Sequence, residues 1–352
     1  MNWHEEMNKI TLSSPQVDEY KYQGLIDIVI PVYNDRQGLQ ETLFSLNIKH
    51  KYHIVVVDDC STEEKYEDII EIFKPFHDIE LVKTPTNGGP AVAKNVGAQY
   101  CKNKYITFID AGDTLVNVNI LMQVEKILEE NPHGCFISCA HYEEGGDASL
   151  KYVPPEHNRW MGKVYRKNFY DKSNLHFCED TSFCNDDIGM NMLARLIATE
   201  DKILHYEEPV IIWHINQKSV TRKDGYDHSF KESNMGTAKS AVYALQEGRK
   251  RFVHPNKSKE LICSVICGLY YNCLSTLSYK PEFYEEAFAG AQYFYDQTMR
   301  GANIDMTMLT DIYYITTSTR LNNEEWEPAL LKLPPMSFIE FLNKLEASDG
   351  TH

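Results

Sequence analysis

The chain has 352 residues and a formal net charge of −16. Its hydrophobic content of 43% and charged content of 24% are typical of a globular protein, and its length allows one large domain plus a smaller one. The strong acidity argues against broad, sequence-independent binding of nucleic acid.

No run of eighteen uncharged apolar residues occurs, and Met1–Ile10 carries Glu5, Glu6 and Lys9. We therefore expect neither a signal peptide nor a membrane span. Nine cysteines, an odd number without a regular framework, favour free thiols and a cytoplasmic location.

Two cysteine pairs leave zinc binding open as an alternative. Cys263 and Cys267 are spaced by one helical turn, and Cys178 and Cys184 flank an acidic stretch. Because neither pair has the CxxC spacing of a structural zinc site, structural thiols are the favoured interpretation.

Residues 1–22 show no clean period and are expected to form an N-terminal arm. From Leu25 onward, short β-branched runs alternate with segments of helical period. The predicted strands are 26–32, 53–57, 79–83, 105–109 and 135–140, and the predicted helices are 37–46, 64–73, 90–101 and 119–130. This alternation predicts an α/β fold with a doubly wound, mostly parallel sheet.

The second half of the chain changes pattern. Residues 141–155, with Gly-Gly and Pro-Pro pairs, are predicted to be loop, followed by helices at 161–170 and 188–197 and a strand at 203–213. Apolar periodicity through 260–277 and 281–299 predicts a helical C-terminal domain over 231–352. The α/β domain then covers 23–230, with a first half of about 23–141 and a second of about 142–230.

Four segments place polar residues where ligands of α/β folds bind. They are Ile30–Asn34, Val55–Ser61, Asn87–Asn95 and Phe108–Asp113, and three of them follow a run of apolar, β-branched residues. Such runs predict buried parallel strands that deliver side chains to the carboxyl edge of the sheet. In order and spacing the segments resemble family 2 of the inverting glycosyltransferases, which have the GT-A fold. The resemblance covers about residues 25–220.

The resemblance implies which residues bind a nucleotide-sugar donor. The first segment would contact the nucleoside through Pro31, Tyr33, Asn34 and Asp35, although Asn-Asp is also a good helix cap. Asp59, next to Asp58, would accept a hydrogen bond from the base, and plain strand-end capping is the alternative.

The third segment would lie beneath the diphosphate, through Asn87 and Lys94. The family usually has arginine at the position of Lys94. Lysine keeps the positive charge but cannot bind a phosphate through two parallel hydrogen bonds as arginine does. Neither GxxxxGK[ST] nor GxGxxG occurs, which disfavours P-loop NTPases and dinucleotide dehydrogenases.

Asp110 and Asp113 form the most informative local motif. Two carboxylates on one tight turn make a hard oxygen site for Mg²⁺ or Mn²⁺, which bridges a diphosphate. The family reads Asp-x-Asp, whereas here Gly112 is third and the acid is fourth, so which carboxylate touches the metal stays open. A capped Asx-type turn is the alternative.

The acceptor half contains an acidic pair, Asp186-Asp187, that we map onto the Glu-Asp pair of the family. An inverting transfer needs one carboxylate as general base, and we predict Asp187. Asp186, Glu179 and Asp180 are the alternatives, and acidic residues also favour a helix N-terminus for dipole reasons.

Two further predictions concern the end of this half. His214, after the strand ending in Trp213, is expected to be a third metal ligand or a diphosphate contact, with a structural role as the alternative.

Residues 151–260 hold 18 basic and 15 acidic side chains, and this middle part of the chain is the only one with a net positive charge. Arg222 and Lys223, together with Arg249–Arg251, are therefore predicted to bind an anionic acceptor, with solvated surface charge as the alternative.

Together these features predict a metal-dependent inverting hexosyl- or pentosyltransferase. The family implies a UDP-sugar donor. The acceptor is expected to be an anionic polymer such as a teichoic-acid-like polyol phosphate, a glycan, or DNA with hydroxymethylated bases, which would require base flipping. A sugar-nucleotide pyrophosphorylase is disfavoured because residues 31–38 lack a Gly-rich loop; a nucleotide-sugar-binding protein without activity is the other alternative.

The apolar run Leu261–Leu277 leaves a choice between a membrane-surface helix and a buried one. It contains no basic residue, which favours a buried helix or a contact between copies of the chain. The C-terminal helices are therefore the expected contact of a homo-oligomer.

Overall fold

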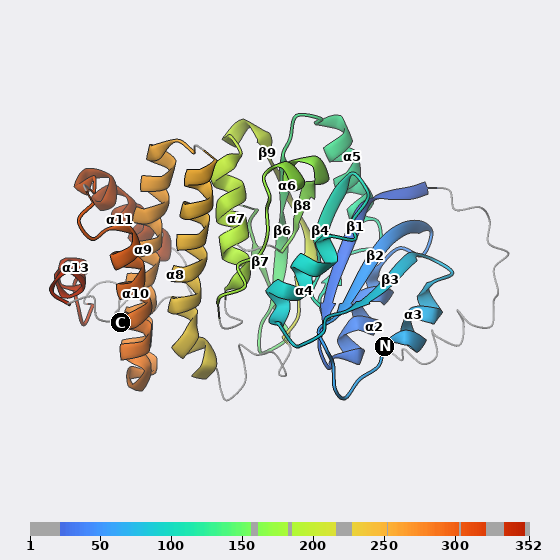
Figure 1. Ribbon diagram of the computed structural model, residues 1–352, viewed down its shortest axis with the longest axis horizontal. Coiled ribbons are helices and arrows are strands. Elements are labelled where there is room, and N and C mark those ends of the chain that lie inside the picture. Colours follow the sequence, from blue (N-terminus) through green and yellow to red (C-terminus); the bar gives the residue numbers. More distant parts are fainter. Residues whose placement is uncertain are drawn as a thin grey trace.

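The computed structural model describes residues 22–155, 161–181, 185–215, 227–251, 253–302, 304–321 and 334–348. Within these residues the strands gather at one side of the molecule, and α8 to α13 stack beside them as a helical layer (Figure 1).

The described strands form one mixed sheet in the order β3-β2-β1-β4-β8-β6-β9-β5, with β7 paired to β6. Their bounds are β1 Tyr22–Val32, β2 His50–Asp58, β3 Asp78–Lys83, β4 Tyr105–Phe108, β5 Thr114–Leu115, β6 Phe136–Glu144, β7 Leu150–Val153, β8 Lys163–Arg166 and β9 Ile203–Trp213.

The α-helices fall into a group that accompanies the sheet and a C-terminal group. The first group is α2 Arg36–Ser45, α3 Glu67–Phe73, α4 Gly89–Ala98, α5 Ile120–Glu130, α6 Lys167–Lys172 and α7 Asp186–Ile197. The second is α8 Asp227–Lys250, α9 Pro255–Tyr279, α10 Tyr284–Thr298, α11 Met306–Leu321 and α13 Phe338–Ala347. Short 3₁₀ turns occupy Glu200–Lys202 and Pro281–Phe283.

The first half of the sheet is parallel, as the sequence predicted. β1 pairs in parallel with both β2 and β4, and β2 pairs in parallel with β3. Alternate residues of β1 enter different cores: Ile28 joins the cluster that includes side chains of α2, α3 and α5, whereas Val29 joins the cluster that includes α4. Burial on both faces explains why these strands read as continuous apolar runs.

Two predictions for the second half were wrong. Residues 141–155 are not loop throughout, because β6 continues to Glu144 and pairs with β7 in an antiparallel hairpin. Residues 161–170 are not one helix: β8 fills the space between β4 and β6, and only then does α6 begin. Val164 pairs with Thr107 on one side and Ile137 on the other, so sheet pairing overrides the local helical pattern.

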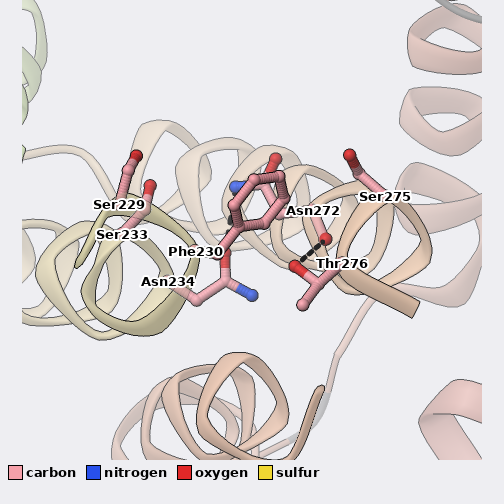
Figure 2. Close-up of a pocket in the computed structure, with 7 residues that line it drawn as sticks. All are labelled: Ser229, Phe230, Ser233, Asn234, Asn272, Ser275 and Thr276. Atoms are coloured by element: carbon pink, nitrogen blue, oxygen red, sulfur yellow. Dashed lines mark hydrogen bonds between the residues drawn. The ribbon is translucent and has the colours of Figure 1, made fainter. Parts of the chain in front are cut away.

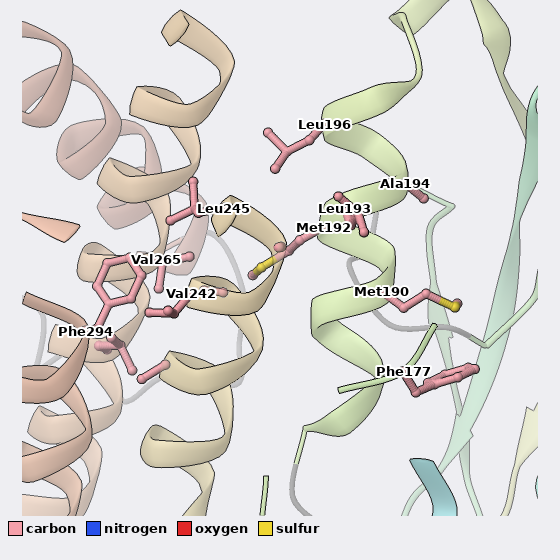
Figure 3. Close-up of a cluster of buried hydrophobic side chains, with 14 of the residues drawn as sticks. Phe177, Met190, Met192, Leu193, Ala194, Leu196, Val242, Leu245, Val265 and Phe294 are labelled. Carbon is pink, nitrogen blue, oxygen red and sulfur yellow. The ribbon is translucent and has the colours of Figure 1, made fainter. Parts of the chain in front are cut away.

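The helical layer continues the core of the α/β part. One buried cluster runs from beneath the sheet through α7 into α8, α9 and α10, and Figure 3 shows Met192 and Leu196 of α7 pointing toward α8, which carries Val242 and Leu245. The predicted domain border at residues 230 and 231 lies in the first turns of α8, which begins at Asp227.

Helix α9 is long and apolar enough to cross a membrane, judged by length and composition among the described residues. In this fold 61% of its most apolar window is buried. Cys263, Cys267, Tyr270, Tyr271 and Cys273 of this helix are buried inside the helical layer. The prediction that the run Leu261–Leu277 is a buried helix is therefore confirmed.

Candidate active site

The polar segments identified in the sequence meet at the carboxyl edge of the parallel strands. Val32 at the end of β1 pairs with Asp58 at the end of β2, and Val29 pairs with Phe108 at the end of β4. The loops that follow these strands consequently lie side by side.

Asn34 and Asp35 hold these loops in place. Asn34 adopts a left-handed backbone with φ 47°, and its Oδ1 accepts hydrogen bonds from the backbone N–H groups of Thr62 and Glu63, both at 3.0 Å. Asp35 caps α2 by accepting from the N–H of Gly38 at 3.0 Å. Both residues therefore have structural partners beside any role in donor binding.

The other two residues of this segment differ in access to solvent. Pro31 is buried within β1. Tyr33 is 44% exposed, and so it is the side chain of this segment that is open to a nucleoside.

Asp59 is buried and organises the loop before α4. Its Oδ1 accepts from the hydroxyl of Thr84 at 2.8 Å and from Gly88 N–H at 3.1 Å, and its Oδ2 accepts from Gly89 N–H at 2.6 Å. A bond from Asp59 to a nucleotide base would compete with these three, so that role stays a prediction.

Asp58 is likewise engaged within the protein. It accepts from Ser61 N–H at 2.8 Å, and its Oδ2 lies 3.3 Å from Lys83 Nζ.

Asp110 and Asp113 lie on one tight turn after β4. The N–H of Asp113 donates to the carbonyl of Asp110 at 3.0 Å, and Gly112 between them has φ +100°, which favours glycine. Thr42 of α2 clamps this turn, since its hydroxyl donates to the Asp113 carbonyl at 2.7 Å and accepts from Gly112 N–H at 3.0 Å.

The two carboxylates of this turn are unequal in access. The Asp110 side chain is 40% exposed, whereas Asp113 is only 4% exposed and accepts from the N–H of His214 at 3.2 Å. Asp110 is therefore the carboxylate that is open to a ligand.

Lys94 supplies a buried cation next to Asp110. Its Nζ lies 3.2 Å from Asp110 Oδ1 and 5.2 Å from the centre of the Phe177 ring. Asn87, in contrast, is exposed, and its side-chain oxygen accepts from Gly89 N–H at 3.2 Å. The positive charge that the resemblance requires near the diphosphate thus sits beneath the carboxylate turn.

His214 is held on both sides of its ring. Its Nε2 lies 2.8 Å from the hydroxyl of Thr114, and its Nδ1 lies 3.2 Å from Oε2 of Glu144. Metal binding by His214 would have to break one of these contacts, so its assignment as a ligand stays a prediction. The sequence reasoning missed Glu144, because it falls in the stretch expected to be loop.

Asn95 connects the first half of the α/β domain (about 23–141), the proposed donor half, to the second half (about 142–230), the proposed acceptor half. Its amide exchanges two hydrogen bonds with the backbone of Phe177, at 2.8 and 3.0 Å, and donates to Oε1 of Glu179 at 2.8 Å. The Phe177 ring stands edge-on to Phe108 at 4.8 Å between centroids. In the sequence Asn95 is simply the last residue of the third segment, and no local signal predicts its contact with residues 82 and 84 positions away.

Asp187 lies in the first turn of α7 and is half-buried. Lys163 of β8 is a fully buried lysine whose pKa is lowered to about 7, chiefly by burial and then by the charge of Arg195, while Asp187 opposes the shift. The predicted general base is therefore near enough to Lys163 for the two charges to influence each other.

The alternative bases are on the segment before α7. Glu179 and Asp180 are both exposed, and Asp180 pairs with Lys239 of α8 at 2.9 Å. The side chain of Asp186, like Arg222 and Lys223, lies outside what the structure describes.

The basic cluster Arg249–Arg251 lies away from the start of α7. It is at the C-terminal end of α8, whereas the contacts of α8 with the start of α7 involve Ser233 and Thr237 near its beginning. Arg251 bonds internally to Ser173 and Glu247. That this cluster binds the acceptor therefore stays a prediction.

The residues of the site differ in how well they suit different divalent cations. Among the described residues no group of three His, Cys, Asp or Glu side chains is placed to hold a metal ion, so the zinc alternative has no site there. Mg²⁺ and Mn²⁺ need less from a protein, since substrate phosphates and water complete their shells. The exposed carboxylate of Asp110 fits that requirement.

Comparison with known proteins agrees with this geometry. Residues 27–186 match the family described as Glycosyl transferase family 2. An uncharacterised glycosyltransferase of Haemophilus influenzae is 34% identical over 33% of this chain and 48% of its own length. EpsJ of Bacillus subtilis, also an uncharacterised glycosyltransferase, is 27% identical over 56% of this chain and 63% of its own length.

A third relative is TarS of Staphylococcus aureus, a poly(ribitol-phosphate) β-N-acetylglucosaminyltransferase. It is 23% identical over 57% of this chain and 38% of its own length. This chain thus spans less than two thirds of each of these relatives. The crystal structure of TarS residues 1–349 with UDP-GlcNAc has a TM-score of 0.63 at 16% identity and covers 86% of this chain and 93% of that one, which shows a shared fold. The chain carries a family 2 glycosyltransferase domain with the GT-A fold.

Proposed function

We propose that the chain transfers a sugar from a nucleotide-sugar to a hydroxyl group of an acceptor, with inversion at the anomeric carbon. The observation that carries the proposal is the Asp110–Asp113 turn, which places an exposed carboxylate beside the buried Lys94 at the end of β4. The donor is proposed to be a UDP-sugar. This is supported by family membership and by the fold shared with the UDP-GlcNAc complex of TarS.

We propose a divalent cation, Mn²⁺ or Mg²⁺, as cofactor, with Asp110 as its protein ligand and Asp113 supporting the turn. Such a cation would neutralise the charge that develops on the departing diphosphate. Lys94 lies close enough to Asp110 to contribute a second positive charge at the same place. Burial of Lys94 fixes its position before substrate arrives.

In the acceptor half, Asp187 is the proposed general base. It would take the proton of the attacking hydroxyl as the new glycosidic bond forms and the bond between sugar and diphosphate breaks. Lys163 of β8 is a buried group near this carboxylate, and the two side chains interact electrostatically. Asn95 fixes the segment that leads to Asp187 against the donor half.

The proposed acceptor is a polyol- or sugar-containing polymer. Support comes from TarS and from a poly(ribitol-phosphate) β-glucosyltransferase of Bacillus spizizenii, which is 34% identical over 25% of this chain and 15% of its own length. These relatives favour a polyol phosphate over the DNA alternative. We propose a cytoplasmic location, consistent with the free state of the described cysteines.

Calorimetric titration with UDP-GlcNAc, UDP-glucose and GDP-mannose, each with Mn²⁺ and with EDTA, tests the donor and the metal. We expect a UDP-sugar to bind with Mn²⁺ and to bind weakly in EDTA or in Asp110→Asn. Equal binding in EDTA would contradict the metal assignment. Incubation with poly(ribitol phosphate) and analysis of the product's anomeric configuration tests transfer; a protein that binds the donor yet neither transfers nor hydrolyses it would be a binding protein instead.

A further inference from the structure

A hollow of about 230 Å³ lies between the beginning of α8 and the end of α9 (Figure 2). It is lined by Ser229, Phe230, Ser233, Asn234, Asn272, Ser275 and Thr276. Every lining side chain is uncharged, in a chain of which 24% of the residues are charged. The hollow therefore offers hydroxyls, amides and one aromatic ring, and no countercharge for an ion.

Part of this polar lining is fixed and part is available. Asn272 donates to the side-chain oxygen of Asn234 at 3.0 Å, and Asn234 donates to the carbonyl of Ala287 at 2.9 Å, so both amides have one orientation. Within the described residues, the hydroxyls of Ser229 and Ser275 make no hydrogen bond to the protein. Figure 2 shows the ring of Phe230 among these groups.

Such a combination suits a sugar or polyol unit. The C–H groups of a polyhydroxyl compound pack on an aromatic ring, and its hydroxyls exchange hydrogen bonds with serine and asparagine. A phosphate or carboxylate would lose its hydration without gaining a charged partner, which is costly. An apolar ligand would leave the serine and asparagine groups unpaired.

The hollow is adjacent to the start of α7, the helix that carries the predicted general base. Ser233, which lines it, accepts a hydrogen bond at 2.8 Å from Asn185, and Asn185 immediately precedes the Asp186-Asp187 pair. Helices α7 and α8 begin at the same end of the molecule (Figure 1). Asp187 is two residues beyond Asn185, about 3 Å along the helix axis.

We propose that this hollow is an acceptor subsite that binds one neutral polyhydroxyl unit, a sugar or a polyol, next to the unit that receives the transferred sugar. As an acceptor subsite it rests on the proposed function, whereas its capacity to bind a polyol does not. The charged linkages of a polymer acceptor would then lie outside the hollow. The helical layer, in addition to supporting the α/β domain, would contribute to acceptor recognition.

The test fills the hollow without removing a native hydrogen bond. In Ser275→Leu the new side chain occupies the space, while Ser264→Leu adds the same side chain at an exposed position of the same helix and is the control. Binding of free ribitol, glycerol, glucose and N-acetylglucosamine is followed by saturation-transfer NMR at millimolar concentration. We expect at least one of them to bind to the wild type and to Ser264→Leu, and to bind at least about tenfold more weakly to Ser275→Leu.

In transfer assays with poly(ribitol phosphate), Ser275→Leu should raise the acceptor KM by a similar factor and leave both kcat and UDP-sugar binding unchanged. The subsite is refuted if no neutral polyol binds to the wild type, if Ser275→Leu binds as well as Ser264→Leu, or if inorganic phosphate displaces the polyol. A third outcome is possible: the protein binds a polyol, loses that binding in Ser275→Leu, and binds no UDP-sugar. This outcome would support the polyol site and refute the proposed transferase function.

Discussion

At the scale of single residues, two consecutive positions of α4 serve different halves of the candidate site. Lys94 pairs with Asp110 at the donor end, and Asn95 bonds to Phe177 and Glu179 at the acceptor end. Phe177 closes the connection, because its ring contacts both Lys94 and Phe108. The position of the segment that precedes α7 therefore depends on the same helix that lies beneath the proposed donor site.

The first prediction concerns this connection. Asn95→Asp keeps the shape of the side chain but cannot donate to the Phe177 carbonyl, and it places a second negative charge beside Glu179. The loss of these bonds should lower the free energy of unfolding by about 1–3 kcal/mol. We expect a lower kcat for transfer and unchanged UDP-sugar affinity, measured by steady-state kinetics and calorimetry.

Asn47→Asp is the matched control, since Asn47 also donates an amide hydrogen bond, to Asn119, away from this junction. If the two variants lose the same amount of kcat, Asn95 has no special role in positioning the acceptor segment.

The second prediction concerns the general base. Asp187→Asn preserves the size of the side chain but cannot take a proton at neutral pH, so transfer should fall by about 10²–10⁴-fold while UDP-sugar binding stays near normal. Glu179→Gln and Asp180→Asn are the comparisons, because both side chains are exposed on the preceding segment. Normal transfer by Asp187→Asn together with an inactive Glu179→Gln would move the base to Glu179.

The residues that the sequence could predict are those that act within one short segment. Asp110 and Asp113 were found because both carboxylates lie on one turn directly after a strand. Thr42 and Glu144 were missed because each reaches the site from about 70 positions away in the chain, and nothing in their local sequence differs from a surface helix or a loop.

At the scale of elements, the sequence predicted secondary structure well in the parallel part of the sheet. It predicted secondary structure poorly where a short strand forms only because it pairs with a neighbouring strand. The predicted helices and strands between residues 26 and 130 are all present, with ends that differ by a few residues. β7 and β8 are only four residues long and exist because a neighbouring strand offers free backbone groups. Such short elements have no period that a sequence pattern can show.

The third prediction tests the contact between α8 and α10. A Cβ added at Gly290 of α10 would lie 2.5 Å from the backbone nitrogen of Met235 and 2.6 Å from the carbonyl carbon of Asn234, both on α8. Gly290→Ala should therefore force the helices apart and lower the free energy of unfolding by about 1–3 kcal/mol, measured by urea denaturation.

Gly268→Ala on α9 is the control, because a Cβ there meets nothing within 4 Å. Replacing glycine by alanine inside a helix is then expected to raise stability by about 0.5–1 kcal/mol. Equal effects of the two substitutions would show that α8 and α10 do not pack as closely as described. Since Asn234 also lines the hollow, Gly290→Ala should weaken polyol binding as well.

At the scale of the whole molecule, polar groups are buried at both ends of the sheet. The carboxyl edge carries the candidate site. Near the opposite ends of β1 and β2, His50, Tyr52 and His77 pack together, with ring centroids 4.5 Å apart for the first pair and 5.9 Å for the second, and His50 lies 3.2 Å from Glu125. This histidine cluster makes the stability of the fold depend on pH, far from the proposed chemistry.

His77 contributes a loss of stability at acidic pH. Burial, and secondarily the charge of His50, lower the pKa of His77 from 6.5 to about 4. Between these two pH values the unfolded chain binds a proton that the folded chain does not, so stability falls as the pH falls from 6.5 towards 4. His53 acts in the opposite direction. Burial lowers the pKa of His53, but its hydrogen bonds to Asp27 and Glu80 outweigh that effect, so the pKa is raised in the folded chain. The stabilisation from His53 is therefore present at low pH and is lost as the pH rises through the pKa of the folded state.

The last prediction separates these opposing contributions by substitution. His77→Leu removes the titrating ring from a buried site and leaves His53 unchanged, so the difference in free energy of unfolding between this variant and the wild type isolates His77. We expect that difference to shift in favour of His77→Leu by up to about 3 kcal/mol as the pH is lowered from 7 to 4, the free energy that corresponds to the change in pKa. Urea denaturation at intervals of pH measures it. His133→Leu, at an exposed position, should follow the wild type throughout. A difference that stays constant with pH would mean that His77 is protonated as readily in the folded chain as in the unfolded one, and the acid sensitivity of the fold would then have to arise from the carboxylates.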